Sequence, residues 1–142
     1  MNIDGITNGI VIDHITCGKA MQLYSMLGLD SLDCSVALIR NVQSKKMGKK
    51  DIIKIDAELD INFDVVGLIS PYATINVIRD GKTVEKKHIG LPEKVVNTVK
   101  CKNPRCITTT EPGIEHTFLL TNKEKVEYRC LYCDTKAELN SL

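Results

Sequence analysis

Hydrophobic and polar positions in the N-terminal part of the chain follow two periods, one typical of strands and one typical of helices. Apolar residues at helical spacing predict helices over residues 19–27 and 62–69, the second capped by Asn62 or Asp60. Apolar, β-branched or alternating runs predict strands over 9–15, 34–42, 51–57, 74–78 and 83–89. The order is βαββαβ with one added strand, so the sequence predicts an α+β domain of the ferredoxin-like type.

Turn-forming residues separate the predicted elements. The polar segment 44–50 is expected to join the second and third strands as a hairpin loop. Asp80-Gly81 supplies the positive φ angles of a tight turn between the last two strands. On the second helix, Phe63, Val66 and Ile69 share the face that we expect to point into the core.

The chain changes character after Leu91-Pro92-Glu93, and we place a domain boundary near residues 92–97. Four of the six cysteines follow this point, in a segment too small to be stable on its core alone. We therefore expect a separate ligand-binding domain over residues 1–94. A small all-β zinc-ribbon domain is expected over residues 95–142.

The cysteine spacing in the second domain predicts a metal site. Cys101-x4-Cys106 and Cys130-x2-Cys133 are two short-spaced pairs, and a tetrahedral zinc ion takes four such thiolates. A closed four-thiolate shell leaves no open position for water, so the zinc would be structural. Two alternatives are four buried thiols without metal and a redox dithiol at the second pair, which lacks a surrounding βαβ pattern.

The two remaining cysteines, Cys17 and Cys34, have no partner at ligand spacing. They are expected to be small buried residues.

Charge and composition narrow the classes of function. There are 19 basic and 18 acidic residues, six aromatic residues and no Trp, which argues against a polybasic protein that coats nucleic acid or membrane. Residues 101–142 are neutral, which weakens the alternative of a nucleic-acid-binding zinc ribbon. No apolar run approaches the ~20 residues of a membrane helix and no secretory leader is present, so we expect a cytoplasmic protein.

Basic residues gather around the predicted hairpin of the first domain. They are Arg40, Lys45, Lys46, Lys49, Lys50 and Lys54. A second group, Lys82, Lys86 and Lys87, lies around the last predicted strand. They form either a solvated surface or a polyphosphate site, in which several ammonium groups converge on one anion.

Common phosphate-binding loops and catalytic motifs are missing. The chain has no GxGxxG, no complete P-loop, no HExxH and no GxSxG. The residues alone therefore indicate a ligand-binding domain joined to a zinc-stapled interaction module.

Five segments together resemble the regulatory chain of aspartate carbamoyltransferase. The matching segments are Gly9–Ile15, Met47–Ile55, Ala73–Asn76, Leu91–Glu93 and the four-cysteine spacing with Glu111-Pro112. The resemblance implies a non-catalytic subunit that acts in pyrimidine biosynthesis and binds CTP and ATP as allosteric effectors. It also implies docking of the zinc domain onto catalytic chains, with six regulatory and six catalytic chains per assembly and the regulatory chains paired as homodimers.

The resemblance also implies roles for individual residues. Asp13 would contact the base or ribose side of the nucleotide, Lys54 and Lys86 the ribose and phosphates, and Lys50 a phosphate or the coupling path. Val11, Asn76 and Ile78 would line the site, and the backbone near Ile6 and Ile78 would read the base. The zinc ligands would be Cys101, Cys106, Cys130 and Cys133.

Overall fold

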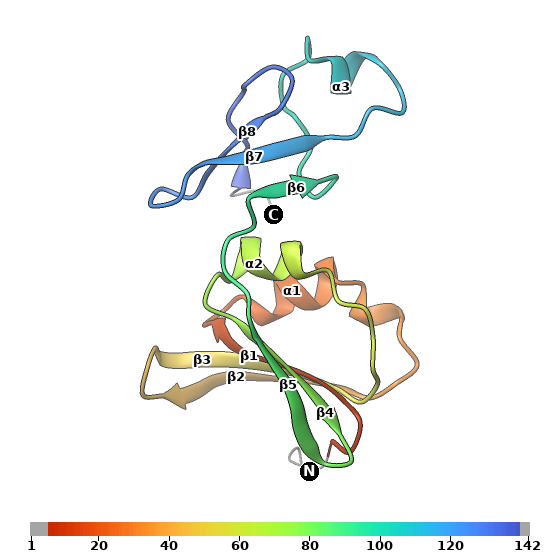
Figure 1. Cartoon of the computed structure of the whole chain (residues 1–142), viewed down its shortest axis with the longest axis vertical. Helices are drawn as coiled ribbons and strands as arrows, with labels where there is room; N and C mark the ends of the chain where they lie inside the picture. The colour runs from red at the N-terminus through yellow and green to blue at the C-terminus, as the bar shows by residue number, and fades with distance from the viewer. Residues whose placement is uncertain (1–5, 140–142) are drawn as a thin grey trace. The chain divides into compact units, whose positions relative to one another are not determined.

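The computed structural model describes residues 6–139 and divides the chain into two compact units, one ending at Gly90 and one beginning at Leu91 (Figure 1). Each unit has its own sheet. In the described part of the chain, no helix has the length and apolar character needed to cross a membrane.

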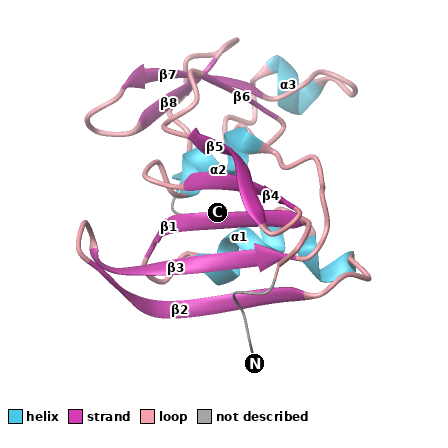
Figure 2. Ribbon diagram, turned by 60° about the horizontal axis from the view of Figure 1, so that its bottom comes forward, coloured by secondary structure: helices cyan, strands magenta, loops and turns pink. Residues whose placement is uncertain are grey.

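A five-stranded antiparallel sheet forms the first unit, in the order β2-β3-β1-β4-β5 (Figure 2). Two helices and a single turn of 3-10 helix complete it: α1 (Ala20–Met26), α2 (Phe63–Ile69) and η1 (Leu29–Ser31). The strands are β1 (Gly9–Thr16), β2 (Val36–Ser44), β3 (Gly48–Ile55), β4 (Thr74–Arg79) and β5 (Lys82–His88). The predicted ferredoxin-like α+β architecture with one added strand is confirmed.

Both helices of the first unit cover the same face of the sheet (Figure 1). On that face Leu23 and Val66 meet buried residues of the central strands, namely Ile10, Ile12, Ile53, Ile55 and Ile75. Side chains alternate between the faces of a strand. The neighbours of these isoleucines therefore point to the other face, which is called the open face below and on which no helix of the described first unit lies.

Helix α2 corrects one detail of the sequence prediction. Asn62 caps it, because its side chain accepts hydrogen bonds from the backbone N–H groups of Asp64 and Val65. Val66 is fully buried as expected, but Phe63 is 40% exposed. Phe63 is the first residue of the helix, and its ring lies against the Lys87 ammonium group, 4.9 Å from its centroid, while Val65 and Leu68 are buried instead.

A buried carboxylate joins β3 to the start of α1 and to a bulge in β2. Asp51 is fully buried, and its oxygens accept hydrogen bonds from the backbone N–H groups of Gly18, Ala20 and Asn41. Asn41 has a positive φ, and the register of β2 shifts between Ile39 and Val42. Asp51 therefore supplies acceptors to backbone groups that the bulge and the helix start leave without ladder partners.

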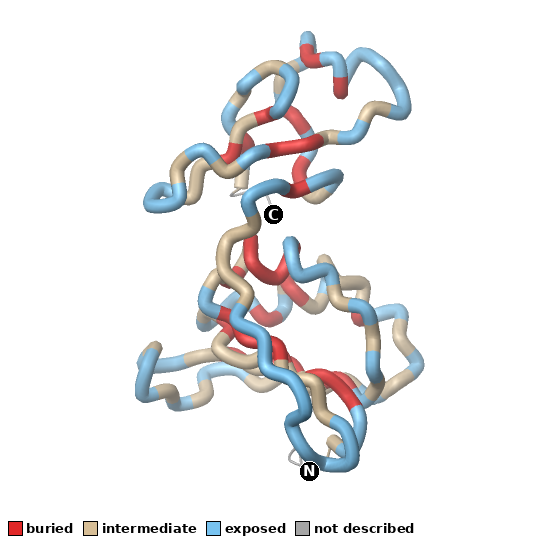
Figure 3. The backbone as a smooth tube through the Cα atoms, viewed as in Figure 1, coloured by how far each residue is buried: buried red, intermediate tan, exposed pale blue. Residues whose placement is uncertain are grey.

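The second unit is built on a three-stranded antiparallel sheet in the order β6-β7-β8. Its strands are β6 (Lys94–Val96), β7 (Thr117–Asn122) and β8 (Glu127–Cys130), and a single helical turn, α3 (Ile107–Thr110), follows Cys106. Val95, Phe118 and Tyr128 are fully buried. In Figure 3 the buried residues of this unit form only short stretches of the chain. This is consistent with a small core that needs a metal or another cross-link for stability.

Candidate functional site

A row of paired residues crosses the open face of the first sheet. Lys54 on β3 lies opposite Val11 on β1, Val11 lies opposite Asn76 on β4, and Asn76 lies opposite Lys86 on β5. Residues directly opposite one another in a sheet present their side chains to the same face. The row therefore places one apolar side chain, Val11, and one amide side chain, Asn76, between two lysines.

The other residues that the sequence singled out share this face. Asp13 pairs with Thr74 and lies two residues after Val11, and Ile78 pairs with Gly9, two residues before Val11. Lys50 lies four residues before Lys54 on β3. The register thus brings all seven predicted nucleotide-binding residues onto the open face.

Lys86 and Lys87 are adjacent in sequence but face opposite ways. Lys86 pairs with Asn76 on the open face, whereas Lys87 pairs with the buried Ile75 and contacts Phe63 of α2. Lys87 also forms an ion pair with Glu85. The register therefore assigns the open-face position to Lys86.

The basic residues of the hairpin do not converge as a group. Lys45, Lys46 and Lys49 are exposed, and Lys49 alternates with Lys50 and so belongs to the other face of β3. Lys50 is different, because its side chain is only 15% exposed and its Nζ lies 2.9 Å from Asp13 Oδ1. Of the basic residues, the register places Lys50, Lys54 and Lys86 on the open face.

Asp13 is the acidic centre of this surface. Burial alone would raise the pKa of its carboxyl, but hydrogen bonds from Lys50 and from the His14 backbone N–H outweigh burial and hold the pKa below its ordinary value. Asp13 is thus an anion that orients the ammonium group of Lys50.

His14 belongs to the site, although no role was assigned to it from the sequence. Its Nδ1 lies 3.1 Å from Thr74 Oγ1 and 3.9 Å from Asp13 Oδ2. Partial burial lowers the pKa of the imidazole; Asp13 opposes that effect, and the ammonium groups of Lys50, Lys46 and Lys86 add to it. The available signal was its position directly after Asp13 in an otherwise apolar strand.

A cavity of about 680 Å³ adjoins these residues within the first unit. His14, His88 and Lys46 contribute its polar groups, and the apolar part of its lining includes Met47 and Tyr72. Its size falls in the range of small-molecule sites.

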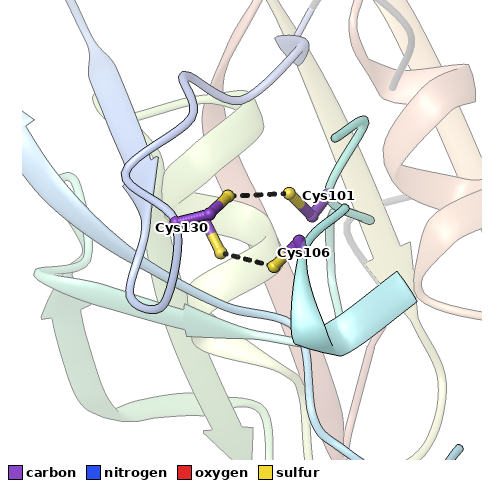
Figure 4. A group of neighbouring side chains, drawn as sticks. Cys101, Cys106 and Cys130 are labelled. Carbon is purple, nitrogen blue, oxygen red and sulfur yellow. Dashed lines mark hydrogen bonds between the residues drawn. The ribbon is translucent and has the colours of Figure 1, made fainter. Parts of the chain in front are cut away.

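Four thiols of the second unit meet at one point. Cys101 and Cys106 precede α3, whereas Cys130 ends β8 and Cys133 lies in the turn after it. Among the described residues these four form the group able to hold a metal ion, with sulfur atoms all within 4.8 Å of one another. Figure 4 shows the Cys101 and Cys106 sulfurs facing those of the Cys130 segment.

The sulfur geometry fits a tetrahedral metal. Cys101 Sγ lies 3.5 Å from Cys133 Sγ, and Cys106 Sγ lies 3.7 Å from Cys130 Sγ. A tetrahedron with metal–sulfur bonds of about 2.3 Å has sulfur–sulfur edges of roughly 3.8 Å. The four side chains could therefore receive Zn²⁺ with small adjustments.

Burial and hydrogen bonding give the four thiols different acidities. Burial raises the pKa of Cys101 to about 12 and also raises that of Cys130. Hydrogen bonding with Thr135 lowers the pKa of Cys133 to about 6, and hydrogen bonding with Thr108 lowers the pKa of Cys106. A bound metal would require all four as thiolates.

The remaining cysteines lie in the first unit. Cys17 is exposed and its Sγ lies 3.0 Å from Asn41 Oδ1, so the expectation that it is buried was wrong. It occupies the turn before α1, which leaves its side chain on the surface. Cys34 is half-buried beside the core of the first unit.

Two sequence models of known families match the chain, one on each unit. The allosteric domain of the aspartate carbamoyltransferase regulatory chain matches residues 1–90, and the metal-binding domain of the same chain matches residues 93–142. The chain belongs to the aspartate carbamoyltransferase regulatory chain family.

Curated relatives support the assignment over nearly the whole length. The aspartate carbamoyltransferase regulatory chain of Clostridium tetani is 54% identical over 135 residues, which is 94% of this chain and 94% of the relative. That of Bifidobacterium longum is 48% identical over 139 residues, covering 98% of this chain and 100% of the relative. That of Clostridium botulinum strain Hall is 48% identical over 134 residues, covering 94% and 92%.

Family membership assigns a role to each unit. The chain is a non-catalytic regulatory subunit of aspartate carbamoyltransferase, so its partners are catalytic chains. The first unit is its allosteric domain. The second is its metal-binding domain, and the four-cysteine cluster lies within it.

Proposed function

We propose that the first unit binds nucleoside triphosphates, CTP and ATP, on its open face and thereby controls the catalytic chains. The observation that carries the proposal is the row Lys54, Val11, Asn76 and Lys86, together with the Lys50–Asp13 ion pair beside it. The arrangement supplies positive charge, a hydrogen-bonding amide and an apolar surface within one site.

The dimensions of the row suit a nucleotide. Three strand spacings of about 4.8 Å separate β3 from β5, so the Lys54 and Lys86 backbones lie roughly 14 Å apart. Their flexible side chains can bend inward over Val11 and Asn76 toward one triphosphate. Ammonium groups that converge on phosphate form charge-assisted hydrogen bonds, which are stronger than neutral ones.

Zn²⁺ is the metal that we propose for Cys101, Cys106, Cys130 and Cys133. Four thiolates in a tetrahedral arrangement favour zinc over hard, oxygen-seeking cations. The metal would contribute on the order of 10 kcal/mol to folding of the second unit. Its role is structural, because the four protein ligands complete its shell.

The assembly that we propose contains six regulatory and six catalytic chains, with regulatory chains paired and zinc units docked on catalytic chains. Effectors act by binding unequally to two global states of this assembly. Such coupling amounts to about 1–3 kcal/mol and is reciprocal for binding. Catalytic-site ligands would then alter CTP affinity by the same factor by which CTP alters theirs.

Lys54→Ala tests the nucleotide site, with Lys49→Ala as a matched control on the same strand and the other face. Loss of a charged hydrogen bond should raise the Kd of CTP about tenfold to a hundredfold and that of cytidine much less. Isothermal titration on the zinc-loaded chain measures both. Equal losses for CTP and cytidine, or equal effects of the two variants, would remove Lys54 from phosphate binding.

The pair Lys86→Ala and Lys87→Ala provides the same comparison on β5. We expect the first to weaken CTP binding and the second to leave it unchanged, because Lys87 faces α2.

A further inference from the structure

The two cysteine pairs share a feature beyond their spacing. The second cysteine of each pair is followed two residues later by a threonine, Thr108 after Cys106 and Thr135 after Cys133. In both cases the threonine hydroxyl lies 3.1 Å from the cysteine sulfur. The same local arrangement therefore occurs twice, on two segments that have different secondary structure.

Each threonine places its hydroxyl and its backbone N–H beside one sulfur: the Thr108 hydroxyl donates to Cys106 Sγ, and the Thr135 hydroxyl, which accepts from the Cys133 thiol, can donate once that sulfur is a thiolate. The backbone N–H groups of Thr108 and Thr135 hydrogen-bond the same sulfurs as their hydroxyls do. Cys101 and Cys130, the first cysteines of the pairs, receive backbone N–H donors, from Asn103 and from Tyr132 and Cys133 respectively. Thr108 is 6% exposed, so its hydroxyl is enclosed beside the sulfur.

Donors of this kind matter once the thiols become metal ligands. Four thiolates around one divalent ion carry excess negative charge. A hydroxyl donor offsets that charge and fixes the direction of the sulfur lone pairs. Groups that orient metal ligands in this way typically change metal affinity about 10- to 100-fold.

We propose that Thr108 and Thr135 are positioning residues of the metal site, and that their hydroxyls hold Cys106 and Cys133 in the ligating state and slow metal release. The inference rests on the proposed zinc site and identifies what retains the metal there. It extends the site from four cysteines to two Cys-x-Thr units.

Removal of the hydroxyl tests the proposal. Thr108→Val and Thr135→Val preserve side-chain shape, and each should release Zn²⁺ to excess 4-(2-pyridylazo)resorcinol about tenfold to a hundredfold faster than the wild-type chain. Thr108→Ser and Thr135→Ser keep the hydroxyl and should release zinc at nearly the wild-type rate. The double valine variant should exceed both single variants.

Thr109→Val is the matched control in the same turn. The Thr109 hydroxyl donates to the backbone carbonyl of Asn103, 2.9 Å away, instead of to sulfur. Its removal loosens the turn but leaves the sulfur donors in place, so zinc release should stay close to wild type. Equal acceleration in Thr109→Val and Thr108→Val would overturn the proposal, because the effect would then arise from the turn.

Cobalt substitution gives a second readout that folding alone does not move. With Co²⁺ in the site, loss of a hydroxyl donor should shift the sulfur-to-cobalt charge-transfer band to longer wavelength, since the thiolate becomes easier to oxidise. An unshifted band together with wild-type release rates in both valine variants would overturn the proposal. Failure of the wild-type chain to hold one Zn²⁺ would instead overturn the proposed metal site itself.

Discussion

At the level of a single residue, His14 couples nucleotide binding to proton uptake. Its imidazole pKa is lowered by burial and by ammonium groups that include Lys50 and Lys86, so the free chain holds it neutral near pH 7. A triphosphate bound to those ammonium groups acts on His14 with the opposite sign and raises its pKa. Binding should therefore take up a proton.

The sign of the pH dependence follows from that uptake. Because His14 holds more protons in the bound state than in the free state, its contribution to CTP affinity should increase as pH falls from about 8 to about 6. Titration calorimetry in buffers of different ionisation enthalpy measures the uptake directly. His14→Gln should abolish it, and an unchanged uptake in this variant would assign the proton to another group.

The role of a residue was predictable from the sequence where its chemistry alone restricts that role. Four cysteines at two short spacings point to a metal, whatever strand or turn carries them. The choice between Lys86 and Lys87 was different, because a strand of period two turns one of them away, and the pairing register decides which one. Phe63 is apolar yet exposed because it begins its helix.

Asp51 shows how one side chain shapes neighbouring elements. Its carboxylate accepts three backbone N–H groups, two at the start of α1 and one in the β2 bulge. Asp51→Asn places an amide NH₂ opposite at least one of these donors. We expect a loss of about 2–4 kcal/mol in the free energy of unfolding, from lost and unfavourable contacts to buried N–H groups.

Urea denaturation of the zinc-loaded chain, followed by circular dichroism, measures this loss. Asp56→Asn is the control, because Asp56 is exposed directly after β3 and its substitution should change stability by less than about 0.5 kcal/mol. A wild-type midpoint for Asp51→Asn would show that Asp51 does not hold the bulge and the helix start.

Strands and helices of the first unit were predictable from periodicity, but their ends were not. The polar segment 44–50 was expected to be a loop, whereas β2 continues to Ser44 and β3 begins at Gly48. The short turn between them is closed by the Ser44 hydroxyl, which accepts from the Met47 N–H. The Asp51-linked bulge depends on contacts between strands and with the start of α1, which no local pattern contains.

At the scale of the whole molecule, the two units have separate cores and separate chemistry. The first unit's core is formed by residues between Ile10 and Ile89, and the proposed nucleotide residues lie between Val11 and Lys86. The four sulfur ligands lie in the second unit. The change of composition predicted a boundary near residues 92–97, whereas the two compact units meet between Gly90 and Leu91.

Zinc removal should therefore separate the two proposed activities. Chelation should unfold the β6–β8 unit and release the chain from catalytic chains, because the metal supplies that unit's folding energy. CTP binding by the first unit should persist at unchanged affinity. Size-exclusion chromatography with catalytic chains and calorimetry on the same sample test both; a complex that survives complete zinc loss would refute the docking role.

The most direct test of the central claim is isothermal titration of CTP and ATP into the purified zinc-loaded chain, with zinc measured on the same sample. The proposed function predicts saturable binding of each nucleotide at one site per chain, competition between the two, and one zinc per chain. A fully zinc-loaded chain, alone and assembled with catalytic chains, that binds neither nucleotide would contradict the proposed effector site on the open face.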